Sequence, residues 1–250
     1  MRKPLFFLIP IVLLGISACK KFDVTVSPAS IVSVDDAATM IAASLTSNTN
    51  GFNIFSPEAV TTSQGVMTTS TGCGITHIDS VSHVNTPGSN TAFSYKYKIS
   101  NKLNCNSNNV ADNVTSTLTF NGNFNGPNLS SVNGGSSVLT IAGFSPTSLV
   151  YSITGQLKST GSFTVKPDST KKGTIGINVV IKSLVITKAT ATTHCIITSG
   201  SGTATITGNS PKGAFTFTGA LTFNGNNVAT FTLGTTTYSV DLLTGVITKK

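Results

Sequence analysis

The densest group of metal-binding residue types lies between residues 73 and 83. His77, Asp79 and His83 follow Cys73, and zinc accepts imidazole, carboxylate and thiolate ligands. On an extended strand these odd-numbered side chains point to one side, but the two histidines would stand about 20 Å apart. Only a loop could bring them to one ion. We therefore expect exposed polar side chains here and no metal or other cofactor.

Cys19 is the residue whose surroundings most clearly predict a chemical modification. Two basic residues near the start of the chain precede the apolar stretch Leu5–Ile16, which is too short to span a bilayer core of ~30 Å. Residues Ile16–Cys19 (Ile-Ser-Ala-Cys) resemble the lipobox of bacterial lipoproteins. The resemblance implies that residues 1–18 are a signal peptide and that Cys19 is acylated, which anchors the protein stably when two or three chains are attached. The alternative is an ordinary secretory signal ending in a chance cysteine.

The residues after Cys19 bear on localisation in the cell envelope. We expect residues 19–32 to form a lipidated tether. In the lipoproteins it resembles, an acidic residue directly after the cysteine retains the protein in the inner membrane. Lys20 is not acidic, which implies delivery to the outer membrane. Only Asp23 could contribute to the acidic cluster that marks surface lipoproteins in some bacteria, so the periplasmic and surface faces both stay open.

Residues suited to catalysis are sparse. A glycosidase-like acid pair would have to come from Asp79, Asp112 and Asp241, for which surface or turn positions are the better interpretation. His194 and Cys195 are adjacent, and adjacent strand residues face opposite ways, so they do not form a thiol–imidazole pair. Neither a phosphate-binding Gly-x-x-x-x-Gly-Lys-Ser/Thr loop nor a Gly-x-Ser-x-Gly nucleophile elbow occurs in the mature chain. We expect no enzymatic activity.

The composition disfavours nucleic-acid binding. Charged residues make up 10% of the 250, against ~25% in ordinary globular domains. Arg2 is the only arginine and is removed with the signal peptide, so the mature chain lacks the planar guanidinium that reads phosphate and guanine bidentately. The formal charge is +8. The scattered lysines favour solubility and weak attraction to anionic lipopolysaccharide or phospholipid surfaces.

Three cysteines follow Cys19. Cys73 and Cys105 lie in polar, loop-like contexts and are the preferred disulfide pair in an oxidising envelope, although three cysteines allow three pairings. Cys195 lies in an apolar strand and would remain a buried thiol.

Residues 33–250 predict a single domain with one clear helix near its start. Ser33 or Asp35 can cap a helix over about 35–45, whose apolar residues recur at helical spacing. A second helix-start signal, Ser-Pro-Glu, lies at residues 56–58. We predict at most a weak helix over 57–70, because that stretch is rich in threonine.

From about residue 91 the hydrophobic period becomes two, which is typical of half-buried strands. Phe93 to Ile99 shows it clearly. Further strand segments are Val114–Phe120, Leu149–Leu157, Phe163–Val165, Ile175–Ile186, Phe215–Phe223 and Tyr238–Leu242. Predicted turns are 121–122, 125–126, 133–135, 167–173, 209–213, 224–225 and 244–245. Strands joined by short turns predict an all-β antiparallel meander, folded as a sandwich or as a curled or barrel-like sheet.

One face of such a meander must be covered. Either the sheet folds over itself as a sandwich or closed barrel, or the amino-terminal helix covers a curled sheet. Because the only good helix is short, we expect sheet-on-sheet packing to supply most of the core and the helix to plug an end or line one edge. The hexapeptide Leu-Thr-Phe-Asn-Gly-Asn occurs at residues 118–123 and 221–226. Local convergence on hairpin chemistry explains it better than duplication of two halves, since the flanks do not stay in register.

The carboxy-terminal run from Phe215 to Gly225, followed by Tyr238-Ser-Val-Asp-Leu-Leu-Thr-Gly, resembles the end of uncharacterised Gram-negative envelope lipoproteins. These proteins also carry a lipobox, an early Asp-Asp-Ala-Ala helix (35–38 here) and a Cys-Gly loop (Cys73 and Gly74). The resemblance supplies no catalytic or ligand residues.

Two kinds of function follow. The first is a non-enzymatic, membrane-anchored envelope protein that is structural or binds a protein, a glycan or a neighbouring cell. The second is a carrier that shelters a lipid or other apolar ligand in a curled sheet with a helical lid. Glycan binding would have no tryptophan platform; the tyrosines remain, of which Tyr95 and Tyr97 are expected to pack in the sheet.

Overall fold

The computed structural model describes residues 32–69, 72–85, 90–144, 148–188 and 195–250. They form two helices, α1 (Val34–Leu45) and α2 (Phe52–Thr69), a 3-10 turn η1 (Ser47–Thr49), and one eleven-stranded sheet. The strands are β1 (Thr76–Val84), β2 (Ala92–Cys105), β3 (Ala111–Asn125), β4 (Leu129–Ala142), β5 (Val150–Val165), β6 (Lys172–Lys188), β7 (Cys195–Ser210), β8 (Gly213–Gly225), β9 (Val228–Leu233), β10 (Thr236–Asp241) and β11 (Ile247–Lys249).

Each strand pairs antiparallel with the next one in the sequence, so the predicted all-β meander is confirmed. The sheet is not closed, and β1 and β11 are its two edges. None of the helices in the described ranges is long and apolar enough to cross a membrane.

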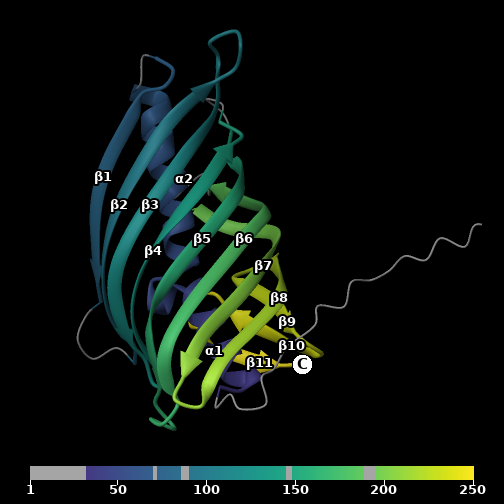
Figure 1. Cartoon of the computed structure of the whole chain (residues 1–250). Helices are drawn as coiled ribbons and strands as arrows, with labels where there is room; N and C mark the ends of the chain where they lie inside the picture. Colours follow the sequence, from purple (N-terminus) through teal and green to yellow (C-terminus); the bar gives the residue numbers. More distant parts are fainter. Residues whose placement is uncertain (1–31, 70–71, 86–89, 145–147, 189–194) are drawn as a thin grey trace, which may run out of the picture.

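The sheet curls around the two helices, which lie in its concave face (Figure 1). Alternate strand residues point inward and form the main core with the apolar faces of α1 and α2. A second, smaller cluster joins Val66 of α2 to Leu103 and Val114. Ile41 and Phe52 from the helices and Ile99, Ile153 and Phe217 from the sheet are all buried in the main core. The expectation of sheet-on-sheet packing was therefore wrong: the helices fill the curl, and no second sheet layer is needed to cover the inner face.

α1 begins as its sequence predicts. The Ser33 hydroxyl accepts from the backbone N–H of Asp36, and the Asp36 carboxylate accepts from the Ser33 N–H, which completes a capping box. α2 is longer than predicted and begins at Phe52, before Pro57. Burial of Phe52 and Val60 against the sheet compensates for the weak helix propensity of the threonine-rich stretch.

Two predicted turns lie instead inside strands. Residues 121–122 belong to β3 and residues 133–135 to β4. The Tyr95 ring covers Gly122 directly across the β2–β3 pair, and the Phe120 ring covers Gly135 across the β3–β4 pair. A Cβ on Gly122 would stand 2.3 Å from the Tyr95 ring. Glycine is therefore needed there to admit a neighbouring aromatic ring rather than to form a turn.

The repeated hexapeptide has two different conformations. Residues 118–123 run straight through β3, whereas residues 221–226 end β8 and enter a turn in which Asn226 and Asn227 are left-handed, with φ of 50° and 59°. The predicted hairpin is therefore present only at the second copy, and hairpin chemistry does not account for the first.

Candidate functional site

The inner face of the sheet is filled with side chains. Two small cavities between α1, α2 and the sheet have volumes of about 20 and 30 Å³, and both border Asn133 and Ser159. Each has room for about one water molecule. Neither cavity could shelter a lipid chain, which weighs against the carrier alternative.

A larger cleft of about 610 Å³ opens at one end of α1. Three parts of the chain surround the cleft: the last turns of α1 together with η1, the β3–β4 turn, and the turn before β11. Asn48 donates to the carbonyl of Thr244 and so ties η1 to that last turn. Phe124, Leu129 and Val246 supply apolar surface, and the polar lining consists of hydroxyls and amides. The polar side chains are Thr39, Thr46, Asn48, Thr49, Asn90, Thr91, Asn128 and Thr244.

No charged side chain lines this cleft within the described ranges. Hydroxyl and amide groups bind neutral polar ligands by hydrogen bonds. Val246 is an exposed apolar residue beside them, whereas Phe124 and Leu129 are largely buried. The chemistry of the cleft therefore suits a neutral, hydroxyl-rich ligand better than a charged one.

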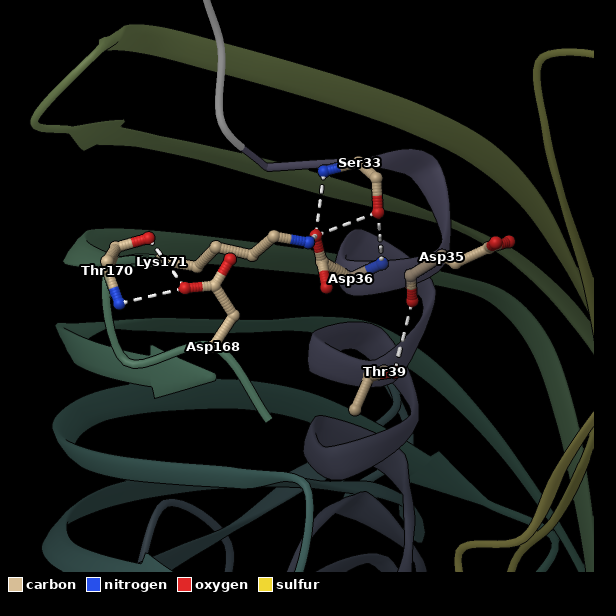
Figure 2. Close-up of polar contacts among 7 residues, drawn as sticks. All are labelled: Ser33, Asp35, Asp36, Thr39, Asp168, Thr170 and Lys171. Atoms are coloured by element: carbon tan, nitrogen blue, oxygen red, sulfur yellow. Dashed lines mark hydrogen bonds and ion pairs between the residues drawn. The ribbon is translucent and has the colours of Figure 1, made fainter. Parts of the chain in front are cut away.

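The opposite end of α1 carries a network of ionic contacts (Figure 2). Asp36 accepts a hydrogen bond from Lys171 of the β5–β6 turn, with an O–N distance of 2.8 Å, while its carboxylate also caps the helix through Ser33. Thr170 in the same turn donates to Asp168 from its backbone and its hydroxyl. These bonds hold the pKa of Asp168 below its usual value.

Asp35 links the start of α1 to the carboxy-terminal strands. It accepts from the Tyr238 hydroxyl of β10 and from Lys249 of β11, 3.0 Å away. The Tyr238 bond and then the Lys249 bond lower the pKa of Asp35, whereas burial and this carboxylate raise the pKa of Tyr238. The helix start is thus fastened to two separate parts of the sheet.

Glu58 and His83 form a partly buried side-chain contact that sequence reasoning did not anticipate. The Oε1 atom of Glu58 on α2 lies 2.7 Å from the Nε2 atom of His83 on the edge strand β1. The His83 ring meets Tyr97 edge-on at a centroid distance of 5.6 Å. Burial raises the pKa of Glu58, and His83 partly opposes that shift. The pair joins α2 to the sheet edge.

The structure does not bring the potential ligands around His77 together. His77, Asp79 and His83 lie along β1, which is the strand arrangement that separates the two histidines. Across the described residues, no group of three or more histidine, cysteine or acidic side chains is placed to hold a metal ion. His83 instead contacts Glu58.

The three candidate acids lie on separate elements. Asp79 is exposed on β1, Asp112 accepts from Asn113 at the start of β3, and Asp241 accepts from two backbone N–H groups of the turn after β10. The turn hydrogen bonds lower the pKa of Asp241. These are surface and turn positions.

The structure joins Cys73 and Cys105, the pair preferred from sequence, in a disulfide with a Cα–Cα distance of 5.6 Å. It connects the segment before β1 to the end of β2. Cys195 is a buried free thiol whose pKa is raised by burial. Cys19 and His194 lie outside the described residues.

Sequence reasoning missed the partners of α1 and α2. The sequence pattern predicts Glu58 only at a helix start and Lys171 only within a turn. Their partners lie 25 or more residues away in the chain, and no local pattern predicts such pairings. The only available signal was compositional, since Glu58 is the single glutamate in the sequence.

Comparison with known proteins found no matching family model, no matching curated protein and no matching solved structure.

Proposed function

We propose that this chain is a lipid-anchored protein of the bacterial envelope, held at the outer membrane through Cys19, whose β domain binds a partner without catalysing a reaction. The filled inner face of the sheet is the observation that carries this proposal, because it leaves the surface and the open cleft as the places where a partner can bind.

The cleft supports a glycan as that partner. Its polar groups are neutral, and Phe124 and Val246 provide apolar surface beside them. The outward faces of the long strands also carry hydroxyl pairs that hydrogen-bond to each other across strands, as between Thr205 and Thr218, beside exposed lysines such as Lys96 and Lys158. Neutral hydroxyl surfaces suit hydrogen bonding to polysaccharide.

A non-enzymatic role is supported by what the titratable groups do. Glu58 pairs with His83, Asp35 and Asp36 fasten α1, and Asp168 and Asp241 shape turns. These groups all have structural partners, and none of them lines the cleft.

The anchor is tested by Cys19→Ser in the native host. The variant should leave the membrane fraction or accumulate as an unprocessed precursor, and mass spectrometry of the wild type should show acyl chains on Cys19. A processed, acylated and membrane-bound Cys19→Ser protein would contradict the anchor.

Binding is tested by titrating peptidoglycan fragments and lipopolysaccharide-derived oligosaccharides, followed by NMR or calorimetry. Asn128→Ala should weaken binding about five- to tenfold, the loss expected for one hydrogen bond of about 1 kcal/mol or slightly more. Asn108→Ala, at the β2–β3 turn, is the matched control and should not weaken it. If no saccharide binds, or if both variants bind equally, the cleft is not a glycan site.

A further inference from the structure

Lysines gather at the end of the sheet where α1 begins. This basic end comprises Lys166, Lys171, Lys172, Lys212, Lys249 and Lys250, from the β5–β6 turn, the β7–β8 turn and the last strand. Its acidic residues are Asp35, Asp36 and Asp168. Figure 1 shows α1 and the carboxy terminus at this end, together with the β7–β8 turn. The basic end therefore carries an excess of positive charge.

Contacts in the structure hold these lysines close together. Lys171 pairs with Asp36 and Lys249 pairs with Asp35, so two neighbouring aspartates connect the β5–β6 turn to β11. The charges of Lys171 and Lys212 both act on Asp168, which places the β7–β8 turn in the same group. The backbone N–H of Lys166 donates to the carbonyl of Asn128, which aligns the β3–β4 turn beside it.

Four lysines of the basic end are available to an outside partner. Lys166, Lys172, Lys212 and Lys250 are exposed, and within the described ranges they form no ion pair. Lys171 and Lys249 are already neutralised by α1. The unpaired charges therefore point to solvent from the turns and the carboxy terminus.

The proposed lipid anchor would attach at this same end. The described chain starts at Val32, directly before the α1 cap Ser33, and Figure 2 places that start beside the β5–β6 turn. Residues 20–32 can span at most about 45 Å when fully extended. A lipid on Cys19 thus limits the start of α1 to within about 45 Å of the membrane surface, while the disulfide lies toward the other end of β2.

We propose that the basic end docks on the anionic phospholipid headgroups of the membrane that holds the anchor. This inference rests on the proposed anchoring through Cys19. Lysine ammonium groups act as point charges and, unlike arginine guanidinium groups, do not form bidentate hydrogen bonds with phosphate. The docking therefore responds to surface charge and salt, and it orients the domain with its α1 start toward the lipid.

Amine labelling of the mature lipidated protein tests the orientation. The protein is reconstituted in phosphatidylcholine vesicles, with or without about one third phosphatidylglycerol to give a negative surface potential. A water-soluble acetylating reagent is applied and each lysine is quantified by mass spectrometry. The lysines of the basic end should react about fivefold more slowly on anionic vesicles, the factor expected per lysine near such a surface. Three exposed strand lysines should react equally on both: Lys96, Lys98 and Lys158.

Two triple variants separate the basic end from total charge. K166Q/K172Q/K212Q should lose the protection of Lys250 on anionic vesicles, and high salt should abolish it in the wild type. K96Q/K98Q/K158Q removes the same charge from the strands and should keep the protection. Equal labelling on both vesicle types would overturn the docking, as would protection seen only on vesicles containing lipopolysaccharide.

This experiment distinguishes a failure of the proposed anchor from a failure of the proposed docking. Incorporation into phosphatidylcholine vesicles needs the acyl chains but no surface charge, so its absence would contradict the anchor alone. Protection of the basic end by added anionic vesicles would still report docking.

Discussion

His83 on the edge strand β1 and Glu58 on α2 hold the first strand of the sheet against the helix inside it, with 2.7 Å between Nε2 and Oε1. The Oε2 atom of Glu58 is buried and has no hydrogen-bond partner among the described residues. Glu58 therefore loses solvation on folding, and His83 is its main compensation.

The pair predicts a pH dependence of stability. Burial raises the folded-state pKa of Glu58 above 4.5, so the folded protein keeps this proton to higher pH than the unfolded chain does. The contribution of Glu58 to the free energy of unfolding should fall as the pH rises from about 4.5 through the raised pKa. Urea unfolding at a series of pH values checks this. Glu58→Gln should lack that contribution, and parallel curves for the two proteins would contradict it.

Removing His83 should lower the stability of the folded state, because the Glu58 carboxylate is then left without this partner. His83→Gln at pH 7 should lower the free energy of unfolding by about 1–3 kcal/mol, because the partly buried Glu58 loses its contact with the imidazole. Adding Glu58→Gln to this variant should recover part of the loss. Additive effects in the double-mutant cycle would show that the two side chains are not coupled.

The disulfide should stabilise the start of the sheet. Cys73 and Cys105 are 32 residues apart, and replacing both with serine should lower the free energy of unfolding by about 2–4 kcal/mol. Reduction of the wild type should have a similar effect. Cys195→Ala is the control, because it removes the free thiol and keeps the disulfide, so reductant should destabilise it as much as the wild type. The Cys73→Ser/Cys105→Ser variant should be unaffected by reductant.

Two glycine-to-alanine changes should have opposite effects on stability. Gly122 lies on a strand under an aromatic ring, whereas Gly65 lies on a helix with open space beside it. Gly122→Ala should lower the free energy of unfolding by about 1–3 kcal/mol, because its Cβ would clash with Tyr95 and the carbonyl of Ser94. Gly65→Ala, on α2, meets nothing within 4 Å and should stabilise by about 0.5–1 kcal/mol. Thermal denaturation of both variants is the measurement. A tolerated Gly122→Ala would mean that the ring does not pack there.

The capping hydroxyl of Ser33 should contribute more to the free energy of unfolding than a hydroxyl within the helix does. Ser33→Ala should cost about 1 kcal/mol in unfolding free energy, since it removes the acceptor for the Asp36 N–H. Thr39→Ala removes a hydroxyl that bonds to a carbonyl of the same helix and should be neutral or slightly stabilising. Equal losses in both variants would argue against the capping role.

Features encoded locally were predictable from the sequence. The cap and apolar spacing of α1 lie within about a dozen residues, and the strand alternation needs only a period of two. The Asn-Gly turns show the limit of this reasoning. Gly122 carries a standard turn signal, but the ring that requires a glycine there belongs to Tyr95 on a neighbouring strand.

The contacts around both helices could not be predicted, because they join distant positions. Asp35 meets Tyr238 and Lys249 across 203 and 214 residues. The length of α2 was missed for the same reason, since burial against the sheet, rather than intrinsic propensity, makes Phe52 helical. The basic end could not be predicted either. Its lysines lie on separate turns that the strand order brings together, and the sequence has no run of lysines that would indicate it.

The strictly sequential order of the meander has a consequence for folding. Each hairpin from β1 onward needs only the strand before it, so the sheet can grow in the direction in which the chain emerges from synthesis or export. The first elements made, α1 and α2, have the opposite requirement: their apolar faces gain full cover only when the last strands arrive. The bond between Asp35 and Lys249 should therefore be among the last to form, and the uncovered helices are the segment that a chaperone would need to protect until then.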